Sequence, residues 1–245
     1  MKTNFFTDKN EALNYLLDKY QVNKAGEITE SGCLEQQSKE IPLLPWRIER
    51  RFVELKNLIK NRTLEDVSTF RFAHLAPAND KTLDELIYQE LDLCEWLGGA
   101  PVSRLFAVFS GEKAVNIIVK LKNDLSCSVE CSVMLPDGAA VISRHEIIAR
   151  RGVASDQVVD TQVPQSSIYT YTAENEKRFT DVDAEIFGLS QGDVNLVRGA
   201  FKVLNESETA EKWTKQHRHL LSLVEEAKKS EINSKASIIE GGKQL

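Results

Sequence analysis

The sequence predicts an α+β fold: one large, mostly antiparallel open β-sheet with helices packed on one face. Between residues 102 and 172, segments rich in Val and Ile follow one another with only short turns between them. Such short connections cannot hold crossover helices, so neighbouring strands are expected to run antiparallel. Helical periodicity flanks this region, over residues 83–97 before it and within residues 193–229 after it.

The composition is ordinary for a globular protein and argues against two kinds of partner. The chain has 245 residues, of which 42% are hydrophobic and 28% charged, and its formal net charge is −6. A general nucleic-acid binder usually carries a basic patch or stripe, so nucleic acid is not an expected partner. No run approaches the ~20 apolar residues of a membrane helix, and the first residues lack a secretory signal. We therefore expect a cytoplasmic protein without membrane contact.

The chain divides into two parts near residue 44. An amphipathic helix is expected over residues 8–20, and the polar stretch over residues 21–40 favours a loop or linker. Two prolines close this stretch, and helices and strands then follow without another break. The expected organisation is therefore an N-terminal helix and linker over residues 1–44, followed by the α+β domain over residues 45–245.

That domain begins with a helix and a strand. A buried stripe predicts the helix over residues 46–60, and alternation predicts the strand over residues 67–75. The strand places His74 on the same side as two phenylalanines, where a lone histidine is either structural or an acid–base group. The helix carries a basic cluster that either binds phosphate or carboxylate or simply faces solvent: Arg47, Arg50, Arg51, Lys56 and Lys60.

The helix over residues 83–97 has recognisable ends and two distinct faces. Thr82 and Glu85 form a capping box at its start, and Gly98-Gly99 ends it. One face is an apolar stripe at helical spacing: Leu83, Leu86, Ile87, Leu91, Cys94 and Leu97. A second face is shared by Glu85, Gln89, Asp92 and Trp96. Trp96, and Trp213 further along the chain, are expected to be buried because each lies in or beside an apolar stripe.

The remaining elements follow from turns and periodicity. Strands are expected over residues 102–109, 114–121, 127–134, 140–150, 157–163 and 167–172. Helices are expected over residues 193–204 and 208–229, and Ile238-Ile239 suits a closing edge strand. The polar side of the strands is rich in Ser and Tyr, which suits a carbohydrate-like site, a subunit interface or an ordinary solvated face. The acidic triplet Asp181, Asp183 and Glu185 lacks the Gly and distal Glu of an EF-hand loop, so no calcium site is predicted.

The four cysteines do not form a metal-binding or disulfide pattern. Cys33, Cys94, Cys127 and Cys131 include no CxxC pair, and no histidine stands at ligand spacing. Cys127 and Cys131 share a strand face with Val129, where they are expected to behave as small buried hydrophobes.

The helix over residues 83–97 and the turn after it resemble the glucose-fructose oxidoreductase and inositol dehydrogenase family. In that family a helix with Asp-x-x-x-His-x-x-Asp precedes a Gly-Xaa-Pro-Val turn and the first strand of a large sheet. Here Glu85-x-x-x-Gln89-x-x-Asp92 and Gly99-Ala100-Pro101-Val102 lie in the same frame. Gln89 stands at the position of the family's catalytic His, and Glu85 at that of its Asp. Through the order of its elements, the resemblance extends over about residues 45–240, the family's substrate and dimerisation domain.

The resemblance implies a domain without redox chemistry of its own. Dinucleotide binding needs a strand, a Gly-rich turn and a helix, and the sequence has no GxGxxG or near variant. Residues 8–20 then suggest a remnant of the lost nucleotide domain, and Lys2 lies near the offset of the family's catalytic lysine without matching its motif. We expect no bound cofactor, a homodimer through the open sheet face, and a role in binding a sugar-like ligand or in assembly.

A second hypothesis is a split or degenerate NAD(P)-dependent oxidoreductase that acts on a sugar or polyol. Another chain would then supply the cofactor domain, and the catalytic candidates are Glu85, Gln89, Asp92 and His74. Without the family's His, Glu85 would have to act as general base, which requires a raised pKa in a buried site. A capping-box role for Glu85 competes with that function. A third hypothesis is an interaction protein without a ligand.

Overall fold

The computed structural model describes residues 6–156, 167–172, 176–180 and 187–239, and it divides the chain into two compact units. The first unit combines Met1–Val53 with Asp181–His219, and the second combines Glu54–Thr180 with Leu220–Leu245. Each unit is therefore assembled from segments far apart in the sequence. The expected boundary at residue 44 falls inside the first unit.

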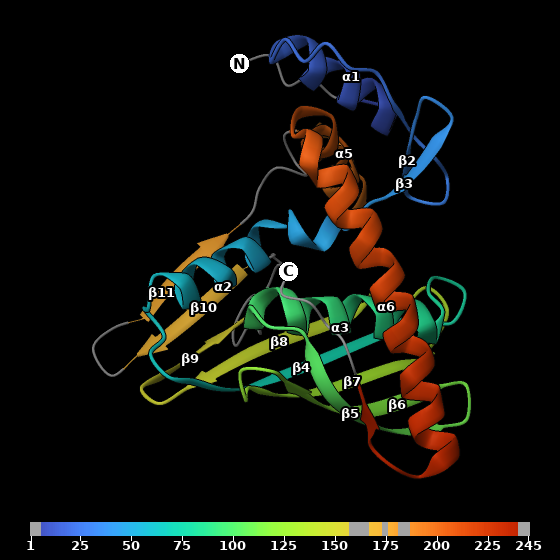
Figure 1. Ribbon diagram of the computed structural model, residues 1–245. Helices are drawn as coiled ribbons and strands as arrows, with labels where there is room; N and C mark the ends of the chain where they lie inside the picture. The colour runs from blue at the N-terminus through green and yellow to red at the C-terminus, as the bar shows by residue number, and fades with distance from the viewer. Residues whose placement is uncertain (1–5, 157–166, 173–175, 181–186, 240–245) are drawn as a thin grey trace. The chain divides into compact units, whose positions relative to one another are not determined.

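The second unit is built on a large, mostly antiparallel sheet (Figure 1), which confirms the predicted α+β fold class. In the described part of the chain it has nine strands in the order β11-β10-β9-β8-β4-β7-β6-β5-β12. The strands are β4 (Val67–Pro77), β5 (Val102–Ser110), β6 (Ala114–Leu121), β7 (Ser126–Leu135), β8 (Ile142–Ala149), β9 (Gly152–Ser155), β10 (Ser167–Thr172), β11 (Glu176–Thr180) and β12 (Ser237–Ile238).

One pair in this sheet, β4 with β7, is parallel. The chain leaves β4 through α3 (Leu83–Gly98), enters the antiparallel meander β5-β6-β7, and returns beside β4. A parallel pair requires a long connection, and α3 provides it. This helix packs on β4, β6 and β7, so the sheet strands that carry the core lie directly beneath it.

The core of the second unit lies between α3 and the inner side of the sheet. Phe70 and Phe72 on β4 are buried and stack with ring centroids 5.3 Å apart. On β7, Cys127, Val129 and Cys131 are buried together, as the alternation predicted. The alternate residues of these strands point the other way and are more exposed, which defines an open face of the sheet.

The β5 edge of the sheet is closed by the C-terminal part of α6 (Ser207–Asn233) and by β12. The Ala107 amide donates to Ser230 Oγ at 3.2 Å, and the Phe109 amide donates to Glu231 Oε2 at 3.1 Å. These contacts satisfy edge amides that would otherwise remain unpaired. The predicted closing edge strand is confirmed, one residue earlier than expected, at Ser237–Ile238.

The first unit contains α1 (Lys9–Lys19), a small sheet of three strands, a 3₁₀ turn η1 (Pro45–Arg47) and α5 (Gln191–Asn205). α1 and η1 both pack against α5. Asn10 on α1 binds both backbone groups of Ile28 through its side-chain amide, at 2.7 and 3.2 Å. A single side chain thus holds the helix to the small sheet.

The prediction of a loop or linker over residues 21–40 is wrong. This stretch contains β1 (Glu27–Ile28), β2 (Cys33–Gln36) and β3 (Lys39–Pro42). A two-residue turn at Gln37 and Ser38 joins β2 to β3, and both turn residues have positive φ, at 51° and 58°. Hairpin turns of this kind usually contain Asn-Gly or Asp-Gly, so Gln-Ser gave no turn signal.

Other boundaries also differ from the prediction. The helix expected from residue 46 is a 3₁₀ turn followed by α2 (Arg50–Lys60), and β9 was not predicted. The strand expected over residues 157–163 lies outside the described residues, as do Lys2 and the acidic triplet near residue 183. Among the helices that the structure describes, none has the length and apolar character needed to cross a membrane.

Replacement of Trp213 by alanine should destabilise the protein by about 3–5 kcal/mol, because this side chain is only 4% exposed and packs on Gly199. Urea unfolding measures the effect. The matched control is Leu221→Ala on the same helix, where the side chain is 48% exposed and the expected loss is below ~0.5 kcal/mol. A loss under about 1 kcal/mol for Trp213→Ala would contradict a core position for Trp213.

Candidate functional site

The candidate site is organised by α3, whose first turn is fixed by the predicted capping box. The Glu85 amide donates to Thr82 Oγ1 at 3.3 Å, and Glu85 Oε2 accepts from the Thr82 amide at 2.7 Å. Burial acts to raise the pKa of Glu85, but the hydrogen bonds from Thr82 outweigh it and hold the pKa below its ordinary value. In this structure Glu85 is an exposed, ionised helix cap.

The other members of the predicted polar face differ in burial along α3. Gln89 is half-buried, and Asp92 is fully buried. Trp96 is half-buried, less than predicted, and its ring is partly covered by Lys56, whose Nζ lies 4.2 Å from the ring centroid. Lys56 also donates to the Trp96 carbonyl at 2.9 Å. The face is therefore exposed at Glu85, most deeply buried at Asp92 and partly exposed again at Trp96.

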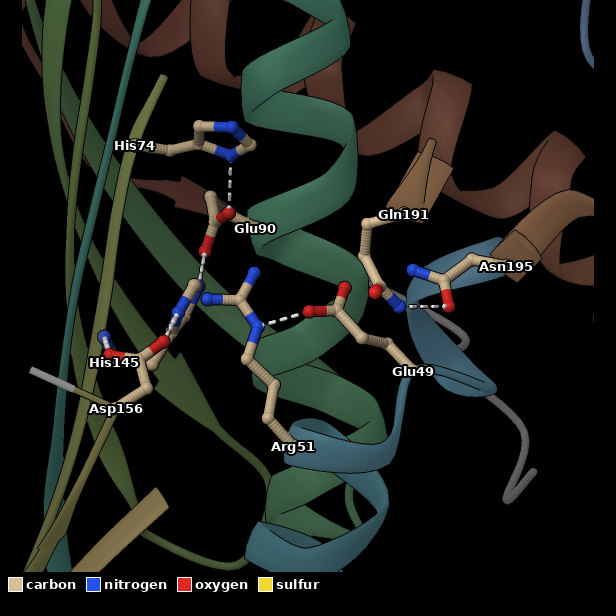
Figure 2. Close-up of polar contacts among 8 residues, drawn as sticks. All are labelled: Glu49, Arg51, His74, Glu90, His145, Asp156, Gln191 and Asn195. Atoms are coloured by element: carbon tan, nitrogen blue, oxygen red, sulfur yellow. Dashed lines mark hydrogen bonds and ion pairs between the residues drawn. The ribbon is translucent and has the colours of Figure 1, made fainter. Parts of the chain in front are cut away.

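His74 is buried beneath α3 and binds a residue that the sequence prediction omitted. Its Nδ1 lies 2.8 Å from Glu90 Oε1, and the two side chains are 5% and 0% exposed. The other oxygen of Glu90 lies 2.9 Å from His145 Nε2. His145 Nδ1 in turn lies 2.7 Å from Asp156 Oδ2. Figure 2 shows these four side chains in one continuous row, His74–Glu90–His145–Asp156.

The sheet register explains how this row of four residues forms. On the inner side of adjacent strands β4 and β8, Phe72 stands opposite His145, and His74 stands opposite Ser143. The Phe72 ring meets the His145 ring edge-on, with centroids 4.9 Å apart. The His145 amide also donates to Asp156 Oδ1, which holds that carboxylate beside the imidazole. Glu90 reaches both histidines from α3, above the sheet.

The charges of the row follow from its hydrogen bonds. Burial acts to raise the pKa of Glu90, but the charge and hydrogen bond of His145 and those of His74 lower it to about 2. Burial acts to lower the pKa of His145, but the charges and hydrogen bonds of Glu90 and Asp156 raise it to about 9. At neutral pH, His145 is therefore an imidazolium between two carboxylates, and Glu90 accepts the Nδ1–H of His74.

The structure brings together only some of the predicted catalytic candidates. His74 meets α3 through Glu90, the residue after Gln89, while Glu85 is occupied at the helix end. Glu90, His145 and Asp156 were missed by the sequence prediction. A signal for Glu90 does exist, because it falls at helical spacing within the apolar stripe between Ile87 and Cys94. A charged residue there must be buried with partners.

The cysteines belong to the core rather than to a reactive site. Cys94, Cys127 and Cys131 are buried free thiols, and Cys33 is half-buried. Burial raises the pKa of Cys94 and of Cys131, so both remain protonated. In the ranges that the structure describes, no group of three or more His, Cys, Asp or Glu side chains is arranged to hold a metal ion.

Two members of the predicted basic cluster are engaged in internal contacts. Arg51 forms an ion pair with Glu49 and lies over the Phe52 ring, with its guanidinium carbon 4.4 Å from the centroid. Lys56 binds the Trp96 carbonyl, as described above. These contacts favour a structural role for this cluster over a phosphate site.

A cavity of about 500 Å³ lies apart from the candidate residues, at the C-terminal ends of α2 and α3. Its lining includes Asp66, Gly98 and Asn123. Asp66 pairs with Arg150 at 3.0 Å, and Asn123 donates to the Gly98 carbonyl at 2.9 Å. The side chains of Asp66 and Asn123 are therefore already engaged in contacts within the protein.

Several solved oxidoreductase structures are similar to this chain in fold. Levoglucosan dehydrogenase, solved with NADH and levoglucosan, has a TM-score of 0.64 and 12% identity, with 81% of this chain and 65% of that chain covered. An inositol dehydrogenase homologue from Azotobacter vinelandii, solved with NADH and myo-inositol, has a TM-score of 0.61 and 9% identity, with coverages of 81% and 64%.

A third similar structure is an oxidoreductase from Agrobacterium radiobacter in complex with NAD⁺, L-tartaric acid and magnesium. Its TM-score is 0.63 and its identity 11%, with 81% of this chain and 64% of that chain covered. No family model and no curated protein matches the sequence. At these identities the likeness establishes the fold alone, and this chain spans just under two thirds of the neighbours' length.

The free energy of unfolding should be highest between about pH 4.5 and 6.5. The pKa of Glu90 in the folded protein lies below its ordinary value of 4.5, so the contribution of Glu90 to the free energy of unfolding is lost as the pH falls towards 2. The folded pKa of His145 lies above its ordinary 6.5, so its contribution is complete below 6.5 and is lost as the pH rises towards 9. Urea unfolding across this pH range measures both losses.

The Glu90→Gln substitution tests whether the row His74–Glu90–His145–Asp156 causes this pH dependence. It should lower the free energy of unfolding by about 3–5 kcal/mol, because it removes one partner of a buried charge pair. It should also reduce the loss of stability between pH 6.5 and 9. Glu130→Gln, at an exposed carboxylate on β7, is the control and should keep the wild-type profile. Wild-type stability that stays constant from pH 6.5 to 9 would contradict an imidazolium at His145.

Proposed function

We propose that this chain is a non-catalytic relative of the substrate domain of sugar and polyol oxidoreductases, acting in ligand binding or assembly. The observation that carries the proposal is Gln89 on α3, at the position where the resembling family has its catalytic His. A glutamine amide has no titratable proton, so it cannot accept the hydroxyl proton while hydride leaves. Glu85 offers no replacement, because its pKa is lowered and its carboxylate caps the helix.

The ligands of the similar structures support the proposed ligand class. The similar structures were solved with levoglucosan, myo-inositol or L-tartaric acid, all small polyhydroxylated molecules. A domain that retains this fold can retain such a ligand without the chemistry. The proposed ligand is accordingly a small molecule with several hydroxyl groups.

A split oxidoreductase is the second candidate function, and one observation favours it. His74 is held by a buried carboxylate at 2.8 Å, an arrangement that orients imidazoles in acid–base catalysis. Another chain would have to supply NAD(P), because no Gly-rich strand–turn–helix motif occurs in this sequence.

The open face of the sheet is the proposed assembly surface. Phe106 on β5 stands opposite Ile118 on β6, and with Val108 they are 38–52% exposed. Further along the same cross-strand row, Arg71 pairs with Glu146 at 3.4 Å. An apolar patch beside a charged row suits a protein interface, and a second copy of the chain is the proposed partner.

Light scattering at micromolar concentration should therefore give a dimer. Ile118→Asp should produce a monomer, because it places a charge in the apolar patch. Ile232→Asp is the matched control, since Ile232 is 81% exposed on α6 and belongs to no strand of the sheet, and this variant should remain dimeric. A monomeric wild-type protein would contradict the proposal that the open sheet face is an assembly surface.

The protein alone should neither bind NAD or NADP tightly nor oxidise sugars. Pyrophosphate binding relies on free amides at a helix N-terminus after a Gly-rich turn, and the start of α3 is instead closed by its own capping box. Calorimetric titration and a polyol screen for reduced-cofactor absorbance test both points. Micromolar cofactor affinity, or turnover that Glu85→Ala abolishes, would favour the split enzyme.

A further inference from the structure

We propose that the Nε2 atom of His74 is a ligand-binding position that accepts a hydrogen bond from a hydroxyl group of a small polyhydroxylated molecule. This inference deepens the proposed function and rests on it, since it names the side chain that holds the ligand. It concerns a residue on β4 rather than the Glu85, Gln89 and Asp92 face of α3.

The first step is the orientation of the ring. His74 is 4% exposed, and its Nδ1 lies 2.8 Å from the Oε1 atom of a carboxylate that is itself fully buried. An ionised carboxylate only accepts hydrogen bonds, so Nδ1 of His74 must carry the proton. In the neutral ring, Nε2 is then an acceptor.

The second step is the rigidity of the carboxylate. Glu90 has one oxygen on His74 and the other on His145, which is held in turn by Asp156. Rotation of the Glu90 carboxylate would break a charge-assisted bond to a buried imidazolium. The ring of His74 is thus fixed in one tautomer by a chain of partners, as ligand-binding histidines usually are.

The third step is the free end of the ring. In the described part of the chain no residue hydrogen-bonds to Nε2 of His74, and Figure 2 shows this nitrogen directed away from Glu90. Nε2 of His74 is not among the fully buried polar atoms that lack a partner in the described residues, so it keeps a small contact with solvent. The side chain is 5% exposed, and this residual exposure is where a hydroxyl group is proposed to reach Nε2.

The test is ¹⁵N NMR of the full chain with labelled histidines. We expect the His74 ring to carry its proton on Nδ1. We also expect its Nε2 resonance to shift on titration with myo-inositol, levoglucosan or L-tartrate at concentrations up to about 10 mM. Proton on Nε2, or no shift with any of the three probes, would overturn the proposal and leave only a water-bonded core histidine.

Two variants separate ligand binding from folding. His74→Asn keeps an N–H donor near the Nδ1 position for Glu90 but lacks Nε2, so it should fold and weaken binding of the responding probe by about tenfold. Glu130→Gln, at an exposed carboxylate on β7, is the control and should bind within about twofold of the wild type. Unchanged affinity in a folded His74→Asn would overturn the proposal. The dimer and cofactor measurements are independent of this result.

Discussion

A single buried carboxylate, Glu90, determines how α3 can lie on the sheet. Removing an ion from water costs several kcal/mol unless its partners are close and well oriented. Two histidines on adjacent strands provide them, and Asp156 balances the second. A slip of β8 by one residue would turn His145 to the open face and leave Glu90 without its cation. The polar row therefore couples helix position to strand register.

The parts of the fold that could be predicted are those with local causes. The capping box, the apolar stripe of α3 and the alternation in β4 and β7 all follow from residues within one element. The parallel pairing of β4 with β7 and the row around Glu90 depend on partners far apart in the sequence, such as Glu90 and His145, which are separated by 55 residues. Periodicity carries no information about such pairs.

The same limit applies to the candidate site. The resemblance to the family indicated Glu85, Gln89 and Asp92 as candidate residues. The buried network instead centres on Glu90, the residue next to Gln89. His74 was a candidate, but its partner could not be named before the strand order was known. Adjacent positions on α3 thus have different surroundings: Gln89 is half-buried beside the sheet-facing stripe, and Glu90 lies within it.

The closure of the β5 edge has a consequence for biosynthesis. The amide of Ala107 is satisfied by Ser230, 123 residues later in the chain. A ribosome therefore releases β5 well before the residues that cover its edge, and a nascent chain exposes unpaired strand amides for that interval. Exposed strand edges template aggregation, and residues 230–238 remove this hazard only once they have been synthesised.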